Sequence, residues 1–211
     1  MNRYFIENSN TVLRKVLNKE ENLDIVKDFI ESILNFKIKK IILRHYLGEK
    51  VKYLPKEEKY GILNVRIIDE NDKEFNVGIQ IIDGFYSQEK LITYGASIHV
   101  NQREYNDNNS VADTYTINIL DFRGFSTDNY HKIINFSQRN DLGNMETRDK
   151  IRLHVLELPR FNKVVPKTRE EQWMQYLKGN DIESIEEIKS NNSAIKKLDK
   201  ILTDYWKEEE I

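Results

Sequence analysis

The sequence predicts an α/β fold (α+β mixed), in which a central mixed sheet of four or more strands is flanked by helices. Residues 23–35 and 194–206 repeat apolar side chains at the period of an α-helix. Residues 62–68 and 75–82 are apolar, β-branched runs separated by a polar turn, which indicates a β-hairpin. Further strand-like runs follow a helical segment, and this order of elements is typical of a domain that contains both helices and a sheet.

The composition is that of a folded protein without disulfides. Of the 211 residues, 39% are hydrophobic and 32% are charged, which suffices for a core. There is no cysteine, and the four histidines lack metal-ligand spacing, so a Cys- or His-based metal centre is not expected. The net charge of −2 provides no overall positive field, so any DNA contact must come from a local basic patch. Without an apolar leader segment or a long apolar run, we expect a cytoplasmic protein with no membrane contact.

The first half of the chain is predicted to contain helices, strands and then another helix. Residues 10–16 form a short helix that Asn10 caps, and residues 23–35 form a longer helix. A strand is expected at 38–46, before the hairpin, and a helix at 85–102, after it.

The second half adds three strands and then helices. Residues 114–122 have the apolar density of a buried central strand. Strands are also expected at 133–138 and 152–158, and Pro159 ends the second of these. The remaining helices are predicted at 171–177, 182–188 and 194–206. We expect the apolar face of the last helix to pack on the body of the protein rather than to bind a partner.

Short motifs along the chain resemble those of a nuclease family. They span residues 10–177, and although each is weak alone, their number, order and spacing are informative. The matching segments are N-T-V-L-R-K-V-L from Asn10, E-N at Glu21 with F-I-E-S-I-L from Phe29, G-I-L-N-V from Gly61, V-G-I-Q from Val77, Lys90 with Tyr94, I-N-I-L-D-F from Ile117, and H-V-L-E-L-P-R-F from His154. On these residues the chain resembles the PD-(D/E)XK nuclease superfamily, and within it the PD-(D/E)XK family transposases, or recombination-promoting (Rpn-like) nucleases.

This resemblance implies a restriction-endonuclease-like core. Residues 1–178 would form the nuclease-like domain, and residues 179–211 a C-terminal helical extension packed on it. The family's activity is Mg²⁺-dependent cleavage of DNA. In such a site an Asp and a Glu on adjacent strands hold Mg²⁺, which prefers oxygen ligands, and the metal activates a water and stabilises charge at phosphorus. A Lys or Gln two residues beyond the Glu lies on the same face of its strand.

The chain departs from the family pattern where the metal would bind. Asn64 stands at the Asp position, Gly78 at the Glu position, and Asn10 replaces an acid that the family often carries on its first helix. Gln80 alone matches. We therefore interpret Asn64, Gly78, Gln80 and Asn10 as vestigial catalytic positions, because the loss of two carboxylates removes most of the affinity for a divalent cation. No metal or other cofactor is expected; Mg²⁺ is the cofactor if the protein is active.

Acids elsewhere would have to rebuild a metal site. Asp83 points away from Gln80 by strict alternation, and Asp121 and Glu157 match family positions that we interpret as structural. Four further acids lie in the hairpin turn, which we expect to be too far along the strands: Asp69, Glu70, Asp72 and Glu74. Relocated acids are therefore the less favoured alternative.

Basic and aromatic side chains are the candidates for contact with DNA. The basic candidates lie around the first strand and on the helix after the hairpin, and are Lys39, Lys40, Arg44 and Lys90. A solvated face is the alternative for this cluster, which also includes Lys37. The tyrosines that offer stacking surfaces are Tyr86, Tyr94, Tyr105, Tyr115 and Tyr130. Burial is the alternative for them, above all for Tyr94 and Tyr115, and His99 and His154 are expected to be core residues.

Three functional hypotheses follow. The favoured one is a catalytically inactive PD-(D/E)XK nuclease-like protein that acts as a binding, regulatory or inhibitory protein, with DNA or a protein as partner, in bacterial or phage defence and counter-defence. The second is an active Mg²⁺-dependent DNA endonuclease of the Rpn-like group that uses relocated acids. The third is a structural interaction protein whose C-terminal helices, from residue 181 to residue 211, dock a partner. A homodimer is open in each case.

Overall fold

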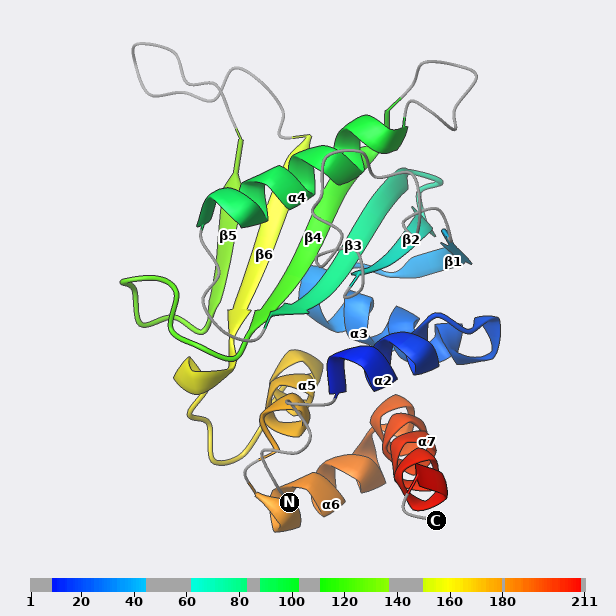
Figure 1. The fold of residues 1–211 in the computed structure, drawn as a ribbon, viewed down its shortest axis with the longest axis vertical. Coiled ribbons are helices and arrows are strands. Elements are labelled where there is room, and N and C mark those ends of the chain that lie inside the picture. The colour runs from blue at the N-terminus through cyan, green and yellow to red at the C-terminus, as the bar shows by residue number, and fades with distance from the viewer. Residues whose placement is uncertain are drawn as a thin grey trace.

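The structure is a computed structural model that describes residues 9–44, 62–82, 88–102, 111–136, 150–179 and 181–209. In these residues six strands form one mixed sheet in the order β1-β2-β3-β4-β6-β5, with helices on both faces (Figure 1). The strands are β1 (Ile38–Leu43), β2 (Ile62–Asp69), β3 (Glu74–Ile82), β4 (Asp113–Leu120), β5 (His131–Asn135) and β6 (Ile151–Glu157). The helices are α2 (Ser9–Leu17), η1 (Glu20–Asn22), α3 (Leu23–Leu34), α4 (Gln88–Asn101), η4 (Leu158–Arg160), α5 (Arg169–Lys178), α6 (Ile182–Asn191) and α7 (Ser193–Glu209). The predicted mixed sheet flanked by helices is confirmed.

The predicted hairpin is β2 and β3, and its own polar residues close the turn. The Asp69 carboxylate accepts hydrogen bonds from the backbone N–H groups of Asn71 and Lys73, both at 2.9 Å. Asp72 has a φ of 59°, in the left-handed region that Asp tolerates better than most residues. The Asp- and Asn-rich stretch therefore sets the register of the two strands.

The sheet has one apolar face and one largely polar face at its centre. Alternate residues of β3 divide between them, so that Val77 and Ile79 point to the apolar side while Asn76 and Gln80 point to the other. The β3 and β4 strands pair in parallel, so each row of side chains continues across the sheet. The chain forms this parallel pair through the crossover helix α4, which contacts β3, β4 and β6. Figure 1 shows α4 lying across these strands, apart from the other helices.

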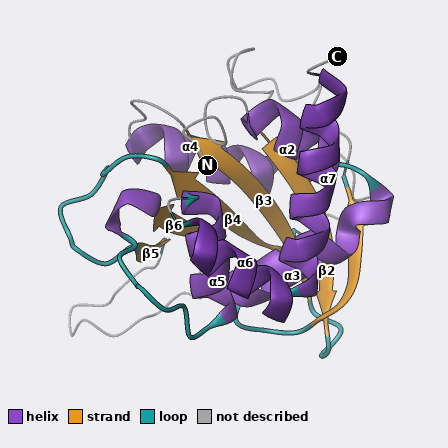
Figure 2. Cartoon of the chain, turned by 90° about the horizontal axis from the view of Figure 1, so that it is seen from below, coloured by secondary structure: helices purple, strands orange, loops and turns teal. Residues whose placement is uncertain are grey.

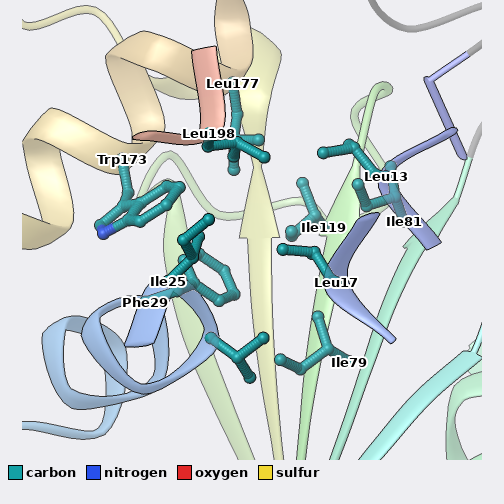
Figure 3. Close-up of a pocket in the computed structure, with 11 residues that line it drawn as sticks. Leu13, Leu17, Ile25, Phe29, Ile79, Ile81, Ile119, Trp173, Leu177 and Leu198 are labelled. Carbon is teal, nitrogen blue, oxygen red and sulfur yellow. The ribbon is translucent and has the colours of Figure 1, made fainter. Parts of the chain in front are cut away.

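Helices from both ends of the chain cover the apolar face. Figure 2 shows α2, α3, α5 and α7 gathered in front of the sheet. Figure 3 shows side chains from these four helices converging on β3 and β4, with Trp173 edge-on to Phe29 at 5.2 Å between ring centroids. They enclose a gap of about 30 Å³ that only apolar side chains line. The gap offers a water no hydrogen-bond partner, so we expect it to be dry.

The apolar face of α7 lies in this same core. Ile195, Leu198 and Leu202 are each at most 3% exposed, and Ile201 and Tyr205 pack at the margin. The helix contacts α2 and α3 near the start of the chain. Segments distant in the sequence therefore share one hydrophobic core.

Several predicted boundaries were wrong by a few residues. The first helix begins at Ser9, so Asn10 lies in its first turn instead of capping it. The β5 strand begins at His131, two residues before the predicted start at residue 133, because His131 pairs with Leu156 of β6. The polar stretch before α3 contains the short helix η1, held by a hydrogen bond of 2.8 Å from the Asn22 side chain to the carbonyl of Val16. Pairings of this kind depend on residues distant in the sequence or on single side chains, which periodicity does not detect.

No helix in the described part of the chain is long and apolar enough to cross a membrane.

The shared core leads to a prediction about α7. Leu198→Ala should lower the free energy of unfolding by about 2 to 5 kcal/mol, because it leaves a cavity among α2, α3 and the sheet. Urea denaturation followed by Trp fluorescence measures this change. The matched control is Lys200→Ala on the exposed side of the same helix, for which we expect a change of less than about 0.5 kcal/mol. Equal effects of the two substitutions would show that α7 is not part of the core.

Candidate functional site

The hairpin brings Asn64, Gly78 and Gln80 together on the face of the sheet that α4 covers. Asn64 lies directly opposite Gly78 in the antiparallel pair, so the two residues share a face. Gly78 is in register with Thr116 of β4, and Gln80 with Asn118. The fourth position that the resemblance suggested, Asn10, is on α2, and the direction of its side chain is not described.

Polar side chains of β3 and β4 hold Gln80 in place. Its Nε2 donates a hydrogen bond to Asn118 Oδ1 at 2.6 Å. The Asn118 amide in turn donates to Thr116 Oγ1 at 2.9 Å and to the carbonyl of His154 at 3.0 Å. Gln80 is 7% exposed and Asn118 fully buried. The one residue that matches the family motif is therefore engaged in a network within the sheet.

Three buried amides on this side of the sheet have hydrogen-bonding atoms without a partner in the described structure. Neither amide atom of Asn64 is hydrogen-bonded, and the side chain is only 1% exposed. The Nδ2 atoms of Asn76 on β3 and Asn101 on α4 are likewise unbonded and buried. Each such group destabilises the fold by about 1 to 3 kcal/mol relative to a bonded one. The layer between α4 and the hairpin is thus polar and closed to solvent.

Helix α4 lies directly against Gly78. A Cβ atom at this position would come within 2.3 Å of Ile98 Cδ1 and 2.6 Å of Tyr94 Oη. Both residues are fully buried, so the burial expected of Tyr94 is observed. The C-terminal end of α4 is fastened to β4, because His99 Nδ1 and Gln102 Nε2 contact Thr114 Oγ1 at 2.9 and 2.8 Å. Sequence reasoning placed Tyr94 and Ile98 on one helix but had no signal for the strand that they contact.

Three of the four acids of the hairpin turn are held in contacts within the described structure. Asp69 closes the turn, Asp72 pairs with Lys39 at 2.5 Å, and Glu74 pairs with Arg66. Glu74 lies four residues along β3 from Gly78, about 13 Å at the usual rise of a strand. Asp83 falls outside the described residues. Asp121 is exposed, just after β4.

The residues at the centre of the site do not fit a divalent cation. Asn64, Gly78 and Gln80 offer amide oxygens but no carboxylate, whereas Mg²⁺ in proteins is held by carboxylates, phosphates and water. No group of three or more His, Asp or Glu side chains suited to a metal ion occurs in the part of the chain that the structure describes. The Asn64 side chain, whose amide atoms have no hydrogen-bond partner in the described structure, is also only 1% exposed.

Glu157 is buried and anchors the loop that precedes β5. Its carboxylate pairs with Lys132 and Arg160 and accepts a hydrogen bond from the backbone N–H of Phe125 at 3.0 Å. Burial by itself would raise the pKa of Glu157, but the bonds from Lys132 and from the backbone of Gly124 and Phe125 outweigh it and hold the pKa below its usual value. The family's acidic position on β6 therefore lies in a fully paired ion cluster.

A hydrogen-bonded chain of two histidines joins β5, β6 and α5. His131 Nε2 lies 2.9 Å from His154 Nδ1, and His131 Nδ1 lies 3.0 Å from Glu170 Oε1. His154 is 6% exposed and edge-on to Tyr115. Burial, with smaller contributions from His131 and Arg152, lowers the pKa of His154 to about 3. His154 is thus the core residue that we expected, and His99 is half-buried against Thr114.

The candidate DNA contacts do not form one patch among the described residues. Lys39 and Lys40 are exposed neighbours on β1, but Lys39 is paired with Asp72. Arg44 follows β1, and its backbone N–H bonds to the carbonyl of Asn64. Lys90 is exposed in the first turn of α4, on the other side of the hairpin from β1.

Among the tyrosines offered as stacking surfaces, those that the structure describes are buried or half-buried. Tyr94 is fully buried, and Tyr115 is 8% exposed and stacked on Phe75. Tyr130 is half-buried, edge-on to Phe161. Tyr86 and Tyr105 lie outside the described residues.

A mixed sheet with helices on both faces, with a hairpin that presents paired positions at its centre, defines a protein of the restriction-endonuclease-like class. The sequence profile of the PD-(D/E)XK nuclease family transposases matches residues 10–211. The match covers nearly the whole chain, so the protein belongs to this family. No curated protein and no solved structure matches the chain.

The closed layer at Asn64 leads to a prediction. Asn64→Asp should lower the free energy of unfolding by several kcal/mol at pH 7, because an unpaired carboxylate would be buried there. Burial would raise the pKa of this Asp above its unfolded value, so the stability of the variant should recover as the pH falls toward 4. Thermal denaturation at pH 5 and pH 8, compared with the exposed control Asn129→Asp, measures the effect. A variant as stable as the control at pH 8 would contradict the closed layer.

His154 leads to a second prediction. Its folded pKa of about 3 is below the unfolded value, so the unfolded chain takes up the proton first and stability falls as the pH drops below about 6.5. Between pH 6 and pH 5 the free energy of unfolding should fall by about 1.4 kcal/mol per pH unit. This pH interval lies above the range in which most carboxylates titrate, so the slope reports on the histidine. Urea denaturation of the native protein and of His154→Gln over this range tests it. A slope that is unchanged in His154→Gln would contradict the assignment.

Proposed function

We propose that this protein is a member of the PD-(D/E)XK nuclease family transposases that does not cleave DNA and acts by binding. The observation that carries the proposal is the pair of Asn64 and Gly78, directly opposite each other under α4. Phosphodiester cleavage by this class requires a metal ion that generates the nucleophile and neutralises developing charge. An amide and a glycine supply none of the negative charge that holds such an ion.

The position of the other acids supports the same proposal. Asp69, Asp72 and Glu74 are at the far end of the hairpin in turn or ion-pair contacts, and Glu157 is paired with two cations. A site rebuilt from these four acids would lose the contacts that they make in the described structure. An endonuclease with relocated acids is the competing hypothesis, and no contact among the described residues favours it.

Charge favours a protein over DNA as the bound partner. The chain has a net charge of −2, and the basic candidates Lys37 and Lys39 are paired with Glu31 and Asp72. Non-specific DNA binding depends on unpaired cations that release counterions from phosphate. A regulatory or inhibitory role through a protein partner, including in defence or counter-defence, is the form of binding that we favour.

The test is incubation of the purified protein with supercoiled plasmid and Mg²⁺ or Mn²⁺. We expect no nicked or linear product above that of a metal-free control with EDTA. A Gln80→Ala variant prepared in parallel separates activity of this site from a contaminating nuclease. Metal-dependent cutting that Gln80→Ala abolishes would overturn the proposal.

A binding measurement on the same preparation separates the two partner classes. We expect fluorescence anisotropy of a short labelled duplex to give a dissociation constant no tighter than about 1 μM at physiological salt. Tighter binding that weakens steeply with salt and is lost in Lys39→Ala/Lys40→Ala would identify DNA as the partner instead.

A further inference from the structure

The contact of α4 with Gly78 suggests more than the loss of two acids. An atom added at Gly78 would collide with Ile98 Cδ1 at 2.3 Å and with Tyr94 Oη at 2.6 Å, and the Tyr94 ring follows at 3.2 Å for Cζ. A carboxylate at this position needs three more heavy atoms beyond Cβ, and a bound cation needs further room. In this structure the ends of the Ile98 and Tyr94 side chains occupy that space.

The residues that fill this space are held firmly. Tyr94 and Ile98 are fully buried and lie four residues apart on one side of α4. At Gly95, between them, a Cβ would come within 2.6 Å of Leu153 Cδ2 on β6, so the helix backbone also lies close to the sheet. At the end of the helix, His99 and Gln102 are bonded to Thr114. Helix α4 is thus fixed to the sheet on both sides of Ile98.

The surroundings of Gly78 contain several buried polar side chains. The unbonded amides of Asn64, Asn76 and Asn101 lie in the layer that α4 closes. On the opposite face, by contrast, the helices pack mainly through aliphatic and aromatic side chains.

We propose that Ile98, packed beside Tyr94 on α4, fills the space above Gly78 that an acidic side chain and its cation would need, so that this packing keeps a cation out. This inference rests on the proposed function and names the group that holds the site closed. It implies that the side chains of Tyr94 and Ile98 must make room before a carboxylate at position 78 can hold a cation. It also implies that restoring the two acids is insufficient to restore metal binding.

A double-mutant cycle tests the contact without any activity. Gly78→Ala adds only the Cβ atom and should lower the melting temperature by about 3 to 10 °C. Ile98→Val removes the Cδ1 atom and Tyr94→Phe removes the hydroxyl that this Cβ would meet. In the Tyr94→Phe/Ile98→Val background the same Gly78→Ala substitution should cost less than half as much. An equal loss in both backgrounds would overturn the proposal.

A metal-binding experiment tests the consequence. Asn64→Asp/Gly78→Glu should bind Mn²⁺ no better than the native protein in an electron paramagnetic resonance titration. The same acids combined with Tyr94→Phe/Ile98→Ala should bind Mn²⁺ at least tenfold more tightly. Circular dichroism checks that this variant has native helix content. If the variant does not fold, the double-mutant cycle is the deciding test. Tight Mn²⁺ binding by Asn64→Asp/Gly78→Glu alone would overturn the role of α4. So would the absence of tight binding in both variants when both are folded. Either result leaves the plasmid assay of the native protein, and so the proposed function, to be judged separately.

Discussion

The alternation of side chains along β3 is the constraint on which the rest of the structure depends. Odd-numbered positions such as Val77 and Ile79 enter an apolar core, while Asn76, Gly78 and Gln80 face α4. A shift of one residue in the register would exchange the two faces and bury the polar set in the core. The turn at Asp69 opposes such a shift. The Asp69 carboxylate accepts hydrogen bonds from the backbone N–H groups of Asn71 and Lys73, and these bonds fix the turn that sets the register. The polar centre of the protein and its hydrophobic core are therefore specified by the same strand.

The two helical layers stabilise the sheet in different ways. The layer of α2, α3, α5 and α7 buries aliphatic and aromatic side chains and accounts for most of the core. The α4 layer combines apolar contacts over β6 with buried amides over β2 and β3, several of which lack a partner among the described residues. Unsatisfied buried groups are uncommon in native proteins, where a bound water, an ion, strain or a functional role accounts for them. In this chain they lie around Asn64 and Gly78, the positions to which the sequence resemblance assigns the metal ligands, which is compatible with the proposed function.

Much of the fold could be predicted because its signals are local. The periodic segment at α3, the paired runs of β2 and β3 and the Pro159 that follows β6 all identified their elements within a few residues. The start of β5 at His131 could not be predicted, because it depends on pairing with β6 and on Glu170 of α5. At the candidate site, the shared face of Gly78 and Gln80 followed from the period of two. The contact of Ile98 with Gly78 did not, since a helical period says which residues share a face but not what that face meets.

The sequence by itself determined the family, the absence of acids at positions 64 and 78, and the placing of both positions on a hairpin. These are properties of residue type and of spacing along one chain segment. Only the tertiary structure decided that Asn64 lies opposite Gly78 in a closed layer, that Glu157 is held by Lys132 and Arg160, and that Tyr94 and Ile98 fill the space above Gly78. The physical reason is that each of these features depends on how closely two elements distant in the sequence approach each other. That distance is set by side-chain packing across the whole sheet, and no single segment encodes it.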